Sequence, residues 1–135
     1  MEGDGPLHIG RMMRTCPNDL LRSRRIAWLW PLAFGTVAAG WLVLPPTAGA
    51  IVAAGGFAVA GALCVANALD CRRTHCLVTG PLYCLAALLF LARAAGASVP
   101  GDMIIVASIV GTILAFVPEW FGMRYIAKGD GERPR

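Results

Sequence analysis

Long stretches of this chain carry no Asp, Glu, Lys or Arg. The first runs from Ile26 to Leu69, the second from Thr74 to Ala92 and the third from Met103 to Pro118. Helices cross a bilayer as apolar runs of about 20 residues. The composition agrees, because 57% of the residues are hydrophobic and 15% are charged, against about 25% charged in soluble proteins. The pattern predicts an all-α integral membrane protein.

Prolines and glycines divide these stretches into four spans. Pro45-Pro46 interrupts the first stretch, because a proline pair does not continue a helix. Thr79-Gly80-Pro81 has the composition of a helix start, with proline in the first turn. The predicted spans are approximately residues 26–44, 49–69, 80–97 and 103–125, packed as a compact bundle.

The basic residues predict how these spans are oriented. With four spans, every Lys and Arg except Arg93 falls on one side of the membrane, and cytoplasmic segments carry the excess of positive charge. We therefore expect residues 1–25 to be a cytoplasmic N-terminal segment, 26–125 the transmembrane domain, and 126–135 a polar cytoplasmic tail. In a bacterial cell this is a multi-pass protein of the inner membrane.

The same topology accounts for the net charge of +4, so the charge does not indicate a nucleic-acid partner. The expected partner is the lipid bilayer. Close helix packing is also expected, within one chain or in a homo- or hetero-oligomer, because small residues drive helix association in lipid. Alanines recur at every fourth position of the second predicted span, namely Ala50, Ala54, Ala58, Ala62 and Ala66.

Most of the chemically reactive side chains surround the connection between the second and third spans. Cys71, His75 and Cys76 lie in the predicted loop. Cys64 precedes Cys71 by about two helical turns, and Cys84 follows Cys76 by about two turns. Cys64 and Cys84 are therefore expected roughly 10 Å deeper in the membrane than Cys71 and Cys76. This arrangement predicts two stacked cysteine pairs, with His75 beside the pair at the membrane surface.

Thiolates and imidazole are ligands for soft or borderline ions such as Cu(I), Zn(II) and Hg(II). On the cytoplasmic side these thiols are expected to stay reduced, and the neighbouring Arg72 and Arg73 favour thiolate. The predicted metal ligands are Cys71, Cys76, His75, Cys64 and Cys84. The spacing of these cysteines is not a zinc-finger pattern.

Three further residues are accessory or incidental. Glu119 follows Pro118 near the cytoplasmic end of the fourth span, where it can act in the site or pair with Arg73 or Arg124. Asn67 can cap the second span or hydrogen-bond across helices. Cys16 has no second cysteine beside it and is expected to be incidental.

These patterns lead to one function hypothesis and two alternatives. The first is a non-enzymatic protein that binds and transports or transfers a soft metal ion of the mercury, copper or zinc type through the Cys/His hairpin. The second is a membrane scaffold or accessory subunit in which the cysteines only pack. A thiol oxidoreductase is the most distant alternative, because the chain has no C-x-x-C motif.

Overall fold

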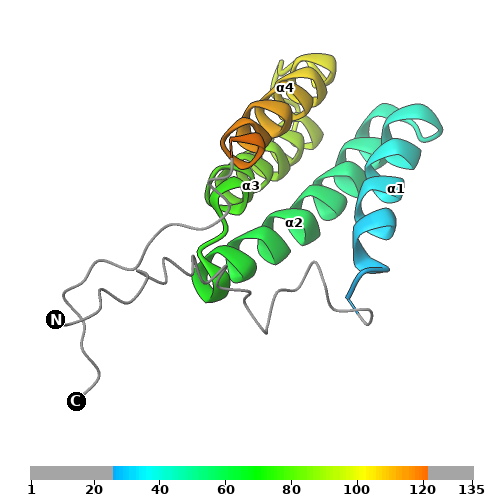
Figure 1. Ribbon diagram of the computed structural model, residues 1–135. Coiled ribbons are helices and arrows are strands. Elements are labelled where there is room, and N and C mark those ends of the chain that lie inside the picture. The colour runs from blue at the N-terminus through cyan, green and yellow to red at the C-terminus, as the bar shows by residue number, and fades with distance from the viewer. Residues whose placement is uncertain (1–25, 122–135) are drawn as a thin grey trace, which may run out of the picture.

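The chain folds into helices joined by short connections. The structure, a computed structural model, describes residues 26–121 and contains no strand in that range. The helices are α1 (Leu29–Leu42), α2 (Pro46–Cys71), α3 (Thr74–Ala94) and α4 (Gly101–Trp120) (Figure 1). This confirms the predicted helical class.

The helices differ in whether they are long enough for a bilayer. α2, α3 and α4 are each long and apolar enough to cross a membrane. α1 has 14 residues, which span about 21 Å at 1.5 Å per residue, so it is shorter than the hydrocarbon core of a typical bilayer. The membrane character is thus supported by three helices, against the four spans that the sequence predicts.

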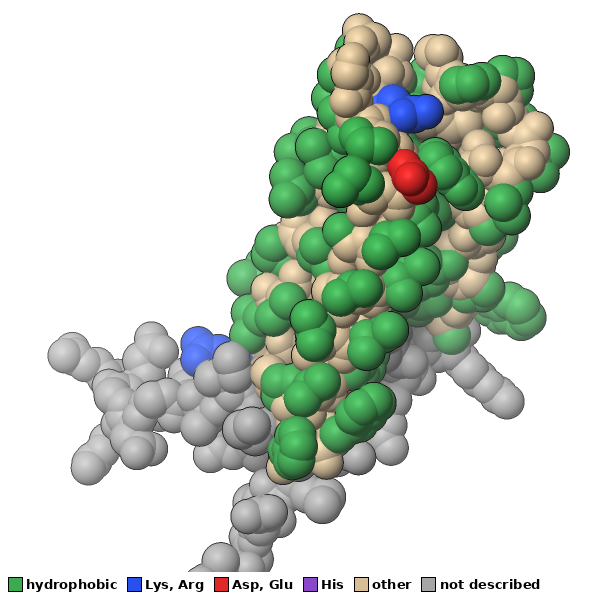
Figure 2. All heavy atoms as spheres, turned by 90° about the horizontal axis from the view of Figure 1, so that it is seen from above, with side chains coloured by type: hydrophobic (Ala, Val, Ile, Leu, Met, Phe, Trp, Pro, Cys, Tyr) green, Lys and Arg blue, Asp and Glu red, His purple; other side chains and the backbone are tan. Residues whose placement is uncertain are grey.

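Apolar side chains cover most of the outer surface, as expected for a protein in lipid. Hydrophobic side chains are spread over the whole face shown in Figure 2, and its few charged side chains lie near the ends of the helices. Large exposed apolar residues occur on every helix, among them Leu32, Ile51, Leu88 and Leu114. In water such a surface would be a very large apolar patch.

Each helix packs against its neighbours in sequence, and α2 and α3 form the centre. Glycines permit the close approaches. A Cβ atom at Gly49 would overlap the backbone of Gly40 in α1, and one at Gly61 would lie 2.8 Å from the Cys84 sulfur in α3. These contacts make α2 antiparallel to both neighbours, so residues 26 and 121 lie at the same end as the α2–α3 connection.

The alanine row of α2 is only partly buried within the chain. Ala50 and Ala54 are buried, whereas Ala58 and Ala62 are exposed. A step of four residues turns 400° on a helix with 3.6 residues per turn, so such a row drifts by about 40° per step. The buried face instead alternates steps of three and four residues, through Ala53, Phe57, Ala60, Cys64, Asn67 and Cys71.

The third helix begins six residues before the predicted span. It starts at Thr74, and Pro81 lies inside it. The prediction that Thr79-Gly80-Pro81 starts the helix is therefore wrong. Backbone groups in lipid must be bonded internally, so a membrane helix tolerates an interior proline and extends past it. As a result His75 and Cys76 lie in the first turn of a helix.

Only Arg72 and Arg73 connect α2 to α3. Arg72 adopts a left-handed conformation with φ of 50°, and its N–H bonds to the Ala68 carbonyl at 2.9 Å, which ends α2. A non-glycine residue costs roughly 1 kcal/mol in this conformation. Glycine would adopt this conformation with less strain. The predicted role of Arg72 in orienting the spans by its positive charge gives a reason for arginine at this position.

Candidate functional site

The functional side chains gather where α2 ends, α3 begins and α4 ends. The antiparallel packing of α2 on α3 places the last turns of one beside the first turns of the other. α4 returns along α3, so that Glu119 near its C-terminus reaches Arg73 and His75. The site is thus built from three helices and one short connection.

A pair of buried thiols forms the centre of the site. Cys64 of α2 and Cys76 of α3 are 2% and 0% exposed, and their thiols lie close enough to influence each other electrostatically. The Asn67 amide donates to the Cys76 sulfur at 3.5 Å. The Thr79 hydroxyl lies 3.3 Å from the Cys64 sulfur and 3.0 Å from the His75 carbonyl. We call Cys64 and Cys76 the thiol pair.

His75 links the thiol pair to α4. Its Nε2 lies 3.2 Å from the Cys76 sulfur, and its Nδ1 lies 2.5 Å from Oε1 of Glu119. The ring stacks on Phe116 with centroids 4.3 Å apart and planes 17° apart. Since both nitrogens and one face of the ring are in contact, the orientation of the imidazole is fixed from three sides.

Glu119 also accepts a hydrogen bond from Nε of Arg73 at 3.3 Å. The carboxylate is therefore shared between a guanidinium from the α2–α3 connection and an imidazole from α3. Its side chain is 9% exposed. A carboxylate at this depth requires such partners, because burying an unpaired charge is costly.

Donor and acceptor capacities give these contacts a direction. A carboxylate only accepts, so Nδ1 of His75 donates to Glu119, and Nε2 of the neutral ring is then an acceptor. In the neutral pair the Cys76 thiol donates to Nε2. The contacts run from Cys64, which lies beside Cys76, through Cys76 and His75 to Glu119. We call this sequence of four residues the relay.

The relay and the two residues that hydrogen-bond to it include six of the residues predicted from the sequence, namely Cys64, Cys76, His75, Glu119, Asn67 and Arg73. Of the alternatives left open for two of them, Asn67 hydrogen-bonds across helices and Glu119 pairs with Arg73. Arg124 and Cys16 lie outside the described residues.

The cysteine pairing differs from the predicted one. Cys64 lies beside Cys76 and not at the level of Cys84, which is half-buried against Gly61. Cys71 is buried at the end of α2 and is disulfide-bonded, whereas Cys64, Cys76 and Cys84 are free. The prediction of reduced thiols thus fails for Cys71. The prediction of two stacked cysteine pairs assumed a loop at residues 70–79. The earlier start of α3 changes the register of its cysteines against those of α2.

The ligand set is smaller than the predicted five residues. Among the described residues, no group of three or more His, Cys, Asp and Glu side chains is arranged to hold a metal ion. Two thiols and an imidazole already engaged with Glu119 remain. Chemically, such a site can bind an ion that accepts two sulfur ligands, or it can form and break a disulfide.

Two residues that contact the site, Thr79 and Phe116, were not predicted from the sequence as part of it. Thr79 was interpreted as a helix cap, and Phe116 was not distinguished from other apolar residues of its span. Thr79 lies four residues after His75, and Phe116 lies three before Glu119, which are the spacings of neighbours on a helix face. Those spacings relative to His75 and Glu119 are the signals that could have identified them.

Comparison with protein-family models, with curated proteins and with solved structures gives no match to this chain. The function must therefore be argued from the thiol pair and the residues around it.

Proposed function

We propose that this chain is a multi-pass inner-membrane protein that binds and carries a soft metal ion, with Cys64 and Cys76 as its two ligands. The observation that carries the proposal is the thiol pair itself: two buried thiols from different helices that lie close enough to influence each other electrostatically. Soft thiolate ligands select soft ions over the hard ions Mg²⁺ and Ca²⁺.

The number of ligands narrows the choice of ion. Zn(II) in proteins is almost always bound by four ligands, or by three with an open position, and the site supplies two thiols. Hg(II) and Cu(I) are soft ions that accept two thiolates in a linear arrangement. We therefore favour these two ions over zinc.

Charge separates the two remaining ions. Two thiolates and Hg(II) form a neutral complex, whereas two thiolates and Cu(I) leave one negative charge. The cost of placing an ion in a low-dielectric interior favours the neutral complex. Mercury-type divalent soft ions are thus the proposed cargo.

The relay supports the proposal by providing a route for protons. Ligation by two thiolates releases two protons. His75 lies against the Cys76 thiol and its other nitrogen faces Glu119, so the imidazole takes one of these protons and the carboxylate stabilises the resulting cation. The second proton goes to a ligand displaced from the incoming ion. Arg73 in the α2–α3 connection keeps that carboxylate in place.

The proposed topology has four spans with both chain ends in the cytoplasm. Residues 26 and 121 lie at the end of the helices that carries the thiol pair. In this topology α1, which is shorter than the hydrocarbon core, crosses the membrane together with the residues on either side of it. Arg72 and Arg73 lie at this same end, which agrees with the excess of positive charge on cytoplasmic segments, whereas the disulfide of Cys71 at this end is not expected in the reducing cytosol. An ion leaving the thiol pair would be released toward the cytosol.

Metal retention by the purified protein tests the proposal. In detergent, with an excess of glutathione as a competing single thiol, the protein should retain one Hg(II) ion per chain, because the second thiol of a pair acts at high effective concentration. Cys64→Ser and Cys76→Ser should each lose the ion.

Cys84→Ser is the matched control, since Cys84 is a free cysteine of α3 outside the pair, and it should retain the ion. Cys71 is present in all four proteins and is not expected to substitute for the pair. Equal retention by all four proteins, or none by the unmodified chain, would contradict the assignment and favour a scaffold in which these cysteines pack.

A thiol oxidoreductase is a second candidate, favoured by the contact of His75 with Cys76. An imidazole beside a thiol favours the nucleophilic thiolate. Oxidation of the pair would form a Cys64–Cys76 disulfide and pass two electrons and two protons to an oxidant. Peptide mapping after mild oxidation by oxidised glutathione distinguishes the candidates, because this disulfide should form readily only if the pair works in redox chemistry.

A further inference from the structure

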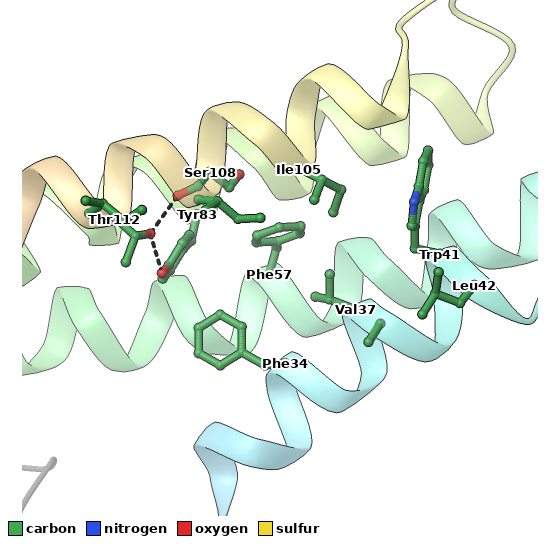
Figure 3. Close-up of a pocket in the computed structure, with 12 residues that line it drawn as sticks. Phe34, Val37, Trp41, Leu42, Phe57, Tyr83, Ile105, Ser108 and Thr112 are labelled. Atoms are coloured by element: carbon green, nitrogen blue, oxygen red, sulfur yellow. Dashed lines mark hydrogen bonds between the residues drawn. The ribbon is translucent and has the colours of Figure 1, made fainter.

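A cavity of about 420 Å³ lies on the side of α2 and α3 that faces the space between α1 and α4. α1 and α4 touch where Trp41 covers Gly101. Val37 of α1 and Ile109 of α4 both line the cavity, and Figure 3 shows the labelled side chains around it. Its volume is in the range that takes small organic ligands.

Aromatic rings form much of the wall. Phe34, Phe57 and Tyr83 all line the cavity, and the centroid of Tyr83 lies 5.8 Å from each of the two phenylalanine rings. Trp41 lies toward the opposite end of the cavity from Tyr83 (Figure 3). Walls of this kind suit a flat apolar ring, which can stack or meet the ring edges.

Three hydroxyls whose hydrogens are all engaged form a polar cluster in the lining, apart from the indole N–H of Trp41 toward the other end of the cavity. Thr112 donates to the Ser108 carbonyl at 2.6 Å, and Ser108 donates to the Ile104 carbonyl at 2.8 Å. Tyr83 and Thr112 are 2.7 Å apart. Since a hydroxyl has one hydrogen and that of Thr112 is in use, Tyr83 must donate to Thr112.

Lone pairs are therefore all that the three hydroxyls can offer to a ligand. Tyr83 and Ser108 are each 4% exposed, so a ligand reaches these lone pairs by displacing the apolar side chains beside them. The Tyr83 and Ser108 oxygens accept no hydrogen bond from the described residues, while each can accept two. A ligand that donates a hydrogen bond is complementary to this cluster. A ligand that can only accept hydrogen bonds, such as an ether or a carbonyl compound, finds no free hydrogen-bond donor in this cluster of hydroxyls.

Depth excludes the headgroups of ordinary lipids. α4 has 20 residues and is about 30 Å long, the thickness of the hydrocarbon core. Ser108 and Thr112 lie on either side of its middle, so the cluster is close to the bilayer midplane if α4 spans the membrane. Phospholipid headgroups stay at the interface, whereas a small neutral hydroxyl compound can reach this depth.

We propose that this cavity binds a neutral, membrane-soluble aromatic alcohol of the phenol or hydroquinone class. Its ring lies against the aromatic wall, and its hydroxyl donates to the lone pairs of the Tyr83, Ser108 and Thr112 cluster. The proposal is independent of the metal site, because it uses none of the thiol pair or relay residues.

A matched pair of ligands tests the proposal on the full chain in lipid nanodiscs. 2,3,5,6-Tetramethylphenol has the donor, and its methyl ether has the same ring without it. The phenol should bind about tenfold more tightly, the value of one neutral hydrogen bond. In Thr112→Val the Tyr83 hydroxyl becomes a free donor, so the preference for the phenol should fall to near unity.

Two further variants separate binding in the cavity from partition into lipid. Ala38→Phe places a ring in the cavity, because Ala38 lines it, and should abolish saturable binding of both ligands. Ala39→Phe adds the same ring at the next, exposed position of α1 and should leave binding unchanged. Equal affinity for phenol and ether in the unmodified chain, or saturable binding that survives Ala38→Phe, would overturn the proposal.

Discussion

Replacing Glu119 by alanine is expected to lower the free energy of unfolding by about 2–4 kcal/mol. Glu119 accepts hydrogen bonds from His75 and Arg73, so its removal leaves a buried imidazole and a guanidinium without their shared acceptor. Glu119→Gln should cost less, since the amide oxygen can still accept from Nδ1. Unfolding of the purified protein by titration with sodium dodecyl sulfate measures the difference.

Asp70→Ala is the matched control for this prediction. Asp70 is an exposed carboxylate on the last turn of α2, near the same end of the helices, and its loss should change the unfolding free energy by no more than about 0.5 kcal/mol. A Glu119→Ala variant as stable as Asp70→Ala would show that the relay does not hold α4 against α3.

Alanine at Gly49 is expected to destabilise the protein by about 2–3 kcal/mol, the upper part of the range for overpacking. A Cβ atom at Gly49 overlaps the Gly40 carbonyl oxygen. Because this neighbour is backbone, no side-chain rotation relieves the overlap, and α1 must move away from α2. The same detergent titration measures the loss.

Gly55→Ala provides the comparison within the same helix. A Cβ atom there meets nothing within 4 Å, and alanine is the better helix former by about 1 kcal/mol. This variant should be as stable as the unmodified chain or slightly more so. Equal effects of the two variants would mean that the close contact of α1 with α2 at Gly49 does not determine the stability.

The sequence predicted the helices better than their ends. Charge-free runs separated by Pro45-Pro46 and by the turn before Gly101 define helices because apolarity and breakers act locally. The start of α3 was predicted too late because Pro81 has the same local preference at a helix start and inside a membrane helix. Only the need to satisfy the backbone in lipid distinguishes the two cases.

The residues of the site could be selected from the sequence, but their pairing could not. Cys64, His75, Cys76 and Glu119 are conspicuous because reactive side chains are rare in apolar spans. Which cysteine lies beside Cys76 depends on the register of α2 against α3, and that register is set by contacts such as Gly61 against Cys84. The hydroxyl cluster of the cavity depends on the same packing.

The central claim is that Cys64 and Cys76 together bind one soft ion, and X-ray absorption at the mercury edge tests it most directly. The protein loaded with one equivalent of Hg(II) should show two sulfur neighbours and no nitrogen or oxygen neighbour at bonding distance. In Cys64→Ser and in Cys76→Ser this two-sulfur signal should disappear, while Cys84→Ser should keep it. A two-sulfur site that persists in Cys64→Ser, or a site with three or four ligands in the unmodified chain, would contradict the account.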